Sequence, residues 1–116
     1  MPKVLVIDDS RYTRIAIARF LAANGFEVFE ADNGMLGLAT ASLEKPDAII
    51  TDLLMPEMDG YQLLERLRTD GNTTPVIVIT ADIQDSTREK IMQRGARAVM
   101  NKPADLPKLL ELLSYA

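Results

Sequence analysis

Five polar side chains stand at points where apolar runs of this sequence end. Asp8 and Asp9 follow the first run, Asp52 follows the third, Thr80 ends the fourth and Lys102 follows the last. A carboxylate at the end of a buried strand is costly unless it is paired, bound to a metal or reactive. If the fold brings these groups together, the set is suited to binding a cation and to phosphoryl chemistry.

Three carboxylates in one place need a cation. Two carboxylates ~4 Å apart repel each other by roughly 4 kcal/mol at an effective dielectric constant near 20. One lysine balances one charge, so we expect a divalent ion, and the absence of cysteine and histidine leaves oxygen ligands. Mg²⁺ commonly takes one or two carboxylates together with phosphate oxygens. A metal beside Asp52, with a lysine and a hydroxyl opposite, is what phosphoryl transfer to a carboxylate requires.

The elements that must position these residues alternate along the chain. The expected strands are residues 3–7, 26–30, 48–50, 75–80 and 98–100, and the expected helices run from an Asp9 or Ser10 cap to Asn24-Gly25 and over residues 35–43, 61–68, 85–94 and 106–113. Such βα alternation with apolar strands predicts a parallel sheet covered by helices, with right-handed crossovers. Five units are too few for an eight-unit barrel, so the predicted fold class is α/β with an open, doubly wound sheet.

This fold class also predicts where the site lies. In a doubly wound sheet, ligands bind at the edge formed by the carboxyl ends of the strands, here named the carboxyl edge. The five polar residues all end or follow strands, so we expect three carboxylates, a hydroxyl and an ammonium to converge there although they are scattered in the sequence.

Length and composition exclude several classes of protein. The 116 residues fit one domain, expected over residues 1–116, and the net charge of −4 without a basic run argues against binding to nucleic acid. No apolar run approaches the ~20 residues of a membrane span. The first residues lead straight into a strand, without the pattern of a signal peptide. We therefore expect a cytoplasmic protein without a membrane partner.

Four segments carry a resemblance to a known family: residues 6–10 (VIDDS), 51–60 (TDLLMPEMDG), 79–81 (ITA) and 101–103 (NKP). In this order and spacing, the chain resembles the receiver domains of two-component response regulators, and closely the stand-alone CheY-like type. The resemblance covers essentially the whole chain. It implies a five-stranded sheet of order 2-1-3-4-5 with five helices, and a role in a phosphorelay, with chemotaxis or motility as the suggested pathway.

The resemblance assigns the phosphoacceptor and the metal ligands. Asp52 would accept a phosphoryl group from the phosphohistidine of a histidine kinase or phosphotransfer domain. Asp9 and Asp52 would bind Mg²⁺ together with the backbone carbonyl of Leu54, and Asp8 would assist through water. Such a protein catalyses its own aspartyl phosphorylation and dephosphorylation, which differs from conventional enzymatic turnover.

The resemblance also assigns the groups that contact the phosphoryl group. Lys102 would bind it, and Thr80 would turn inward to hydrogen-bond it. The Lys102–Pro103 peptide bond would be cis. Phosphorylation would then change the affinity for a downstream target protein, and the small Ala81 would leave the site open to a phosphatase.

Some positions depart from the family pattern. Family members commonly carry Tyr or Phe where this chain has Val99, so an output signal must use another packing change or go unused. Leu54 and Asp82 would flank the path of a hydrolytic water. The aliphatic Leu54 should hinder that water and Asp82 could bind it, which leaves the phosphate lifetime open. Tyr12 and Ile15 are either scattered apolar residues or part of a docking patch for a partner helix.

Three other functions are compatible with this topology. Residues of the sequence argue against two of them, and the third stays open. A flavodoxin-like FMN binder would place hydroxyl and amide groups after the first strand, where Asp8 and Asp9 would repel a phosphate. A haloacid-dehalogenase-type phosphohydrolase would separate its two aspartates by one residue, and here they are adjacent. A phosphate sink or a non-switching interaction module stays open because of Val99. No P-loop motif occurs.

Overall fold

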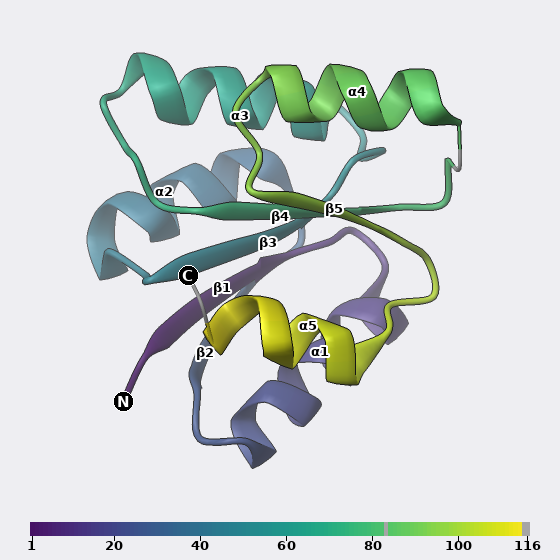
Figure 1. Cartoon of the computed structure of the whole chain (residues 1–116). Helices are drawn as coiled ribbons and strands as arrows, with labels where there is room; N and C mark the ends of the chain where they lie inside the picture. The colour runs from purple at the N-terminus through teal and green to yellow at the C-terminus, as the bar shows by residue number, and fades with distance from the viewer. Residues whose placement is uncertain (83, 115–116) are drawn as a thin grey trace.

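The computed structural model describes residues 1–82 and 84–114 and contains five strands and five helices (Figure 1). In chain order these are β1 (Lys3–Ile7), α1 (Arg11–Ala23), β2 (Glu27–Ala31), α2 (Gly34–Glu44), β3 (Ala48–Asp52), α3 (Gly60–Thr69), β4 (Val76–Thr80), α4 (Asp85–Gln93), β5 (Ala98–Asn101) and α5 (Leu106–Ser114). All neighbouring strands are parallel, in the order β2-β1-β3-β4-β5. The predicted fold class and strand order are confirmed.

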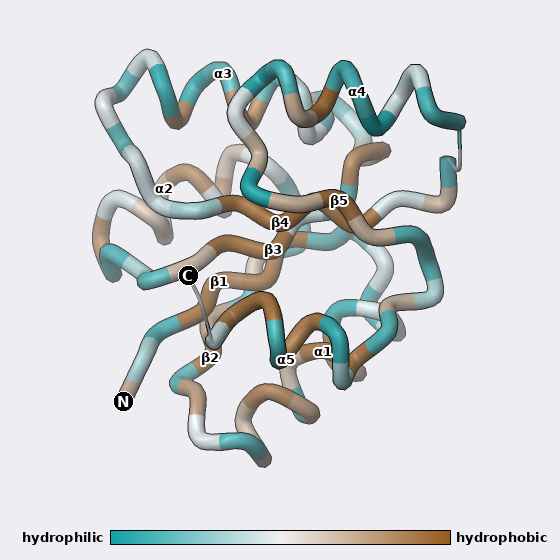
Figure 2. The backbone as a smooth tube through the Cα atoms, viewed as in Figure 1, coloured by the Kyte–Doolittle hydropathy of each residue, from teal (hydrophilic) through white to brown (hydrophobic). Residues whose placement is uncertain are grey.

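The sheet lies between two layers of helices. Figure 1 shows α3 and α4 on one side of the sheet and α1 and α5 on the other, and α2 packs on the side of α3. Alternate residues of the central strands serve both layers: Val76 and Val78 of β4 belong to the cluster under α3 and α4, and Ile77 and Ile79 to the cluster under α1 and α5. The central strands are therefore apolar up to their carboxyl ends, which the brown colour in Figure 2 shows.

The edge strand β2 begins one residue later than predicted. Gly25, with φ +91°, reverses the chain after α1, and the Phe26 N–H still donates to the Leu21 carbonyl of that helix (3.1 Å). Glu27 and Glu30 are exposed, as the alternating pattern predicted for a half-exposed strand.

Side-chain caps fix the starts of α1, α2 and α3 at the carboxyl edge. The Ser10 hydroxyl accepts the Thr13 N–H (3.4 Å) at α1, and Asn33 caps α2 in the same way. Asp59 and Gln62 form a reciprocal capping box at α3. The loops that carry the candidate site residues are thus held at both ends by regular structure.

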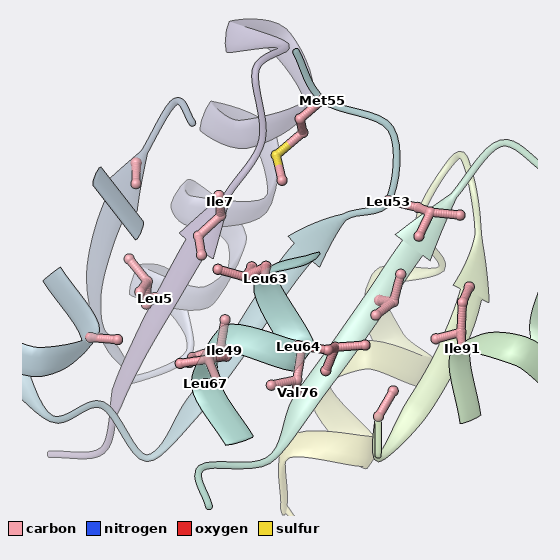
Figure 3. Close-up of a cluster of buried hydrophobic side chains, with 14 of the residues drawn as sticks. Leu5, Ile7, Ile49, Leu53, Met55, Leu63, Leu64, Leu67, Val76 and Ile91 are labelled. Carbon is pink, nitrogen blue, oxygen red and sulfur yellow. The ribbon is translucent and has the colours of Figure 1, made fainter. Parts of the chain in front are cut away.

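Gly37 of α2 is required by close packing against β1. A Cβ atom at this position would lie 2.5 Å from Cδ1 of Ile7, which belongs to the buried cluster of Figure 3. Gly37→Ala would normally favour a helix by ~1 kcal/mol. Here we expect a net loss of about 1–3 kcal/mol in the free energy of unfolding, because the core is overpacked. Urea unfolding measures it, with the exposed Ser42→Ala in the same helix as the control; a stabilised Gly37→Ala protein would contradict the packing argument.

Within the described ranges of the chain, no helix is long and apolar enough to cross a membrane.

Candidate functional site

The sheet brings the predicted residues to one edge, at the right of Figure 1. Asp52 and Thr80 are the last residues of β3 and β4, Asp8 and Asp9 follow β1, and Lys102 follows β5. Because these four strands are adjacent and in register, their carboxyl ends lie together. The chain leaves β1 for β2 on one side and returns to β3 on the other, so the aspartates stand where the strand order reverses.

Three carboxylates meet at this point. One oxygen from each of Asp8, Asp9 and Asp52 lies within 4.8 Å of the other two. Asp8 and Asp52 are 3% and 7% exposed, whereas Asp9 is open to solvent. The Ser10 N–H donates to Oδ1 of Asp8 (2.8 Å), which fixes that carboxylate. The cluster therefore has two buried members and one that solvent can reach.

Lys102 lies between the two buried carboxylates. Its Nζ is 3.2 Å from Oδ2 of Asp8 and 3.1 Å from Oδ2 of Asp52. Burial lowers the pKa of Lys102, but the hydrogen bonds and charges of Asp52 and Asp8 outweigh it, so the pKa is raised and the amine is cationic. Burial, followed by the charge of Asp8, raises the pKa of Asp52, and Lys102 opposes this effect. Three carboxylates against one ammonium leave an excess negative charge that suits a divalent cation.

Thr80 is buried and its hydroxyl is directed to the following loop. Its Oγ1 accepts the Asp82 N–H (3.1 Å), and its carbonyl accepts the Lys102 N–H (2.9 Å). The carboxylate of Asp82 accepts the Gln84 N–H and the Thr87 hydroxyl at the start of α4 (3.0 and 2.8 Å). These two hydrogen bonds, in that order of size, lower the pKa of Asp82. Both oxygens of Asp82 are thus engaged with α4, which the sequence did not indicate.

The loop after β3 folds tightly back on the strand end. The Gly60 N–H donates to the Leu53 carbonyl (2.7 Å), and a Cβ atom on Gly60 would lie 3.0 Å from the Asp52 carbonyl oxygen. Met58 packs against Gly34 at the start of α2 in the same manner. The loop that carries Leu54 is therefore closed against the end of β3, and the Leu54 side chain is 62% exposed.

Arg14 is a site neighbour that the sequence reasoning missed. Its guanidinium donates to the backbone carbonyl of Asp8 (2.9 Å) and to Oε1 of Glu30 on β2 (3.0 Å). It thereby ties the loop after β1 to the edge strand. An arginine one turn after the Ser10 cap, behind a pair of aspartates, is the signal that could have identified it.

Three other expectations concern the flanks of the site. The Lys102–Pro103 bond is cis, as the resemblance implied. Val99 is buried with Ile91 and Val78 in the cluster beneath α4, so the position of the usual aromatic ring is filled by a small aliphatic side chain. Of the proposed apolar pair on α1, Tyr12 is 87% exposed and Ile15 is half-buried.

Comparisons with known proteins agree with this arrangement. The model of the response regulator receiver domain family matches residues 4–114. The chain is 34% identical to protein PilH of Pseudomonas aeruginosa, over 98% of this chain and 96% of that protein. It is 36% identical to response regulator MprA of Mycobacterium avium over 93% of this chain, and it spans 47% of that longer relative.

Solved structures give the same result. The receiver domain of the Francisella response regulator 1452 superposes with a TM-score of 0.95 at 29% identity, covering 99% of this chain and 95% of that one. The chemotaxis response regulator CheY4 of Vibrio cholerae superposes with a TM-score of 0.91 at 31% identity, covering 99% of this chain and 98% of that one. The resemblance inferred from the four sequence segments is confirmed, and the chain belongs to the response regulator receiver domain family.

Proposed function

We propose that this receiver domain takes a phosphoryl group onto Asp52 from a phosphohistidine and then changes its affinity for a partner protein. The observation that carries the proposal is the cluster of three carboxylates at the carboxyl edge, two of which, Asp8 and Asp52, pair with Lys102. An oxygen of Asp52 attacks the phosphorus atom of the donor. As the O–P bond forms, the N–P bond breaks and its electron pair stays on the imidazole nitrogen. The product is an aspartyl phosphate at the end of β3.

The side chains present have separate tasks in this transfer. The ammonium of Lys102, which bridges Asp8 and Asp52, neutralises charge on the phosphoryl oxygens as they arrive. Thr80 supplies one O–H donor once it leaves Asp82. The burial of Asp52 keeps water from competing for its oxygens, which strengthens these electrostatic contacts.

We propose Mg²⁺ as the metal and Asp8, Asp9, Asp52 and the Leu54 carbonyl as the groups that hold it. Support comes from the donor set, which is all oxygen and carries more negative charge than Lys102 balances. When bound, the ion supplies positive charge for the phosphoryl oxygens.

Asp9 gives the sharpest test of metal binding, because it is exposed and lies outside the pairs that Lys102 forms. Asp9→Asn is expected to weaken Mg²⁺ binding by about tenfold or more. The free energy of unfolding should change by less than ~0.5 kcal/mol, as at other surface positions. Calorimetric Mg²⁺ titration measures the first quantity and urea unfolding the second.

Asp32→Asn is the matched control, since Asp32 is an exposed aspartate that follows the neighbouring strand β2. It removes one negative charge from the same end of the molecule. Equal losses of Mg²⁺ affinity in the Asp9 and Asp32 variants would mean that the overall negative charge at this end of the molecule attracts the ion, and that Asp9 is not a ligand.

We propose that the phosphodonor docks beside α1. A groove of about 450 Å³ runs between α1 and the chain after β5, is lined by Tyr12, Ala16, Pro103 and Leu106, and reaches Lys102. A donor helix seated on these apolar atoms would bring its phosphohistidine to the open side of the aspartate cluster. A histidine kinase or a phosphotransfer domain offers such a helix, and a downstream target and a phosphatase are the further partners.

The proposed pathway is chemotaxis or motility, supported by the likeness to a chemotaxis response regulator. A phosphate sink is the second candidate, favoured by Val99, which lacks the aromatic ring that family members commonly carry at this position. The two differ in one observable: a switch binds its target more tightly when phosphorylated, and a sink does not.

Intact-mass spectrometry after incubation with acetyl phosphate tests the proposed function. We expect a Mg²⁺-dependent gain of one phosphoryl mass, and borohydride reduction followed by peptide mapping should place it on Asp52. No gain in a protein that binds Mg²⁺ normally, sampled at short times and low temperature, would overturn the proposal and leave an interaction module.

A further inference from the structure

A chain of hydrogen bonds joins the candidate site to the start of α4. The Thr80 hydroxyl accepts the Asp82 N–H (3.1 Å), and the Asp82 carboxylate accepts the Gln84 N–H (3.0 Å) and the Thr87 hydroxyl (2.8 Å). The Asn101 side chain donates to the Asp82 carbonyl from β5 (3.4 Å). Asp82 is therefore bonded to the end of β4, to the start of α4 and to the end of β5.

The carboxylate of Asp82 takes the place of a helix cap. Gln84 occupies the N-cap position of α4 and provides no side-chain cap of its own in the described part of the chain. Asp82 satisfies the Gln84 N–H and binds Thr87 within the first turn. Because an ionised acceptor makes strong hydrogen bonds, this contact fixes the loop relative to α4.

This loop position determines where the Thr80 hydroxyl lies. The backbone of Thr80 is held in the sheet, where its carbonyl accepts the Lys102 N–H (2.9 Å). Among the contacts of the described residues, the hydroxyl bonds to Asp82 and not to Asp8, Asp52 or Lys102. A shift of this hydroxyl toward Asp52, away from the Asp82 N–H, would bring its O–H to a phosphoryl group there.

We propose that Asp82 is a positioning residue that acts through Thr80: its carboxylate, anchored on α4, keeps the Thr80 hydroxyl on the loop until Asp52 is phosphorylated. The inference rests on the proposed function. When Thr80 turns to the phosphoryl group, the Asp82 N–H loses its acceptor and the loop is free to shift against α4. Phosphorylation is thereby coupled to α4 without the aromatic side chain that Val99 replaces.

The hydrogen bonds from Gln84 and Thr87 to the Asp82 carboxylate are here called the tether. The proposal predicts that removing the tether increases the affinity for an anion that mimics the phosphoryl group. If most molecules hold Thr80 on the loop, an anion that needs the Thr80 hydroxyl binds only to the minor population, which weakens its apparent affinity. Beryllofluoride with Mg²⁺ is a suitable probe, because it mimics a phosphoryl group on a carboxylate. Asp82→Ala and Thr87→Val are each expected to bind it about 3–10-fold more tightly than the wild type.

Matched variants separate the tether from the loss of a negative charge. Thr87→Val removes a hydroxyl and leaves the charge unchanged. Asp82→Asn removes the charge, but its amide oxygen still accepts the Gln84 N–H and its amide nitrogen donates to Thr87. We expect Asp82→Asn to bind beryllofluoride within about twofold of the wild type.

Calorimetric titration with beryllofluoride and Mg²⁺ gives the affinities, and circular dichroism verifies that each variant is folded. If Asp82 and Thr87 had a merely structural role, Asp82→Ala and Thr87→Val would bind beryllofluoride more weakly than the wild type. This is the opposite of the expected increase. Unchanged or weaker binding in both, or equal affinities of the Asn and Ala variants, would overturn the inference while the proposed function stands. A wild-type protein that fails to bind the probe would overturn both.

Discussion

Asp52→Asn is expected to abolish Mg²⁺-dependent phosphoryl uptake and, at the same time, to stabilise the metal-free protein by about 1 kcal/mol at neutral pH. The first effect follows from loss of the nucleophile. The second follows because Asp52 is a buried carboxylate beside Asp8, and burial together with that charge raises its pKa. The neutral amide of Asn removes this penalty and keeps the shape of the side chain.

The contribution of Asp52 to the free energy of unfolding depends on pH with a defined sign. A raised pKa means that the folded protein binds the Asp52 proton more tightly than the unfolded chain does. The stability contributed by this group is full below the ordinary aspartate pKa of 3.8 and is lost as the pH rises through the raised folded value. Asp52→Asn should remove that part of the pH dependence, so its advantage over the wild type disappears in acid.

Urea unfolding in the presence of EDTA, repeated from acidic to neutral pH, measures this difference. Asp47→Asn is the control, because the Asp47 carboxylate accepts the Lys3 N–H at the opposite end of the sheet (2.8 Å). An amide oxygen in its place makes a weaker hydrogen bond, so this variant should be destabilised. If Asp52→Asn were less stable than the wild type at neutral pH, the ion pair with Lys102 would outweigh the burial of Asp52.

The main features of the fold follow from two regularities of the sequence. Alternation of apolar runs and helical segments is enough for a doubly wound parallel sheet, and parallel strands put their carboxyl ends on one edge. Asp8 and Lys102 each follow a strand and Asp52 ends one, so their convergence was predictable without a structure. The order of the strands was not, because alternation is compatible with several orders; it came from the family resemblance.

Contacts within the site were harder to foresee, because they depend on side-chain direction. The sequence places Asp82 two residues after Thr80, but it does not tell whether its carboxylate faces solvent, the site or α4. In the structure it binds Gln84 and Thr87. The hydrogen bond from Arg14 to the Asp8 carbonyl could not be predicted from the sequence either, since it joins a helix to a loop through one guanidinium.

Lys102→Gln is expected to separate metal binding from phosphoryl transfer. The ammonium now pairs with Asp8 and Asp52, the carboxylates proposed to take part in Mg²⁺ binding, at 3.2 and 3.1 Å. Removing it frees both from a competing cation and from the repulsion between two positive charges, so Mg²⁺ affinity should rise severalfold. Phosphoryl uptake should nevertheless fall about 100-fold, as expected for the loss of one charge-stabilising donor in a transition state.

Calorimetric Mg²⁺ titration and the rate of acetyl phosphate-dependent mass gain measure the two quantities, with the exposed Lys108→Gln on α5 as the control for net charge. Opposite changes would mean that Lys102 occupies the carboxylates of the resting site and serves the phosphoryl group only during transfer. A parallel loss of both would instead mean that Lys102 holds Asp8 and Asp52 in place for the metal. A lysine with a purely electrostatic task improves the metal site when it is removed, whereas a lysine with a structural task damages it.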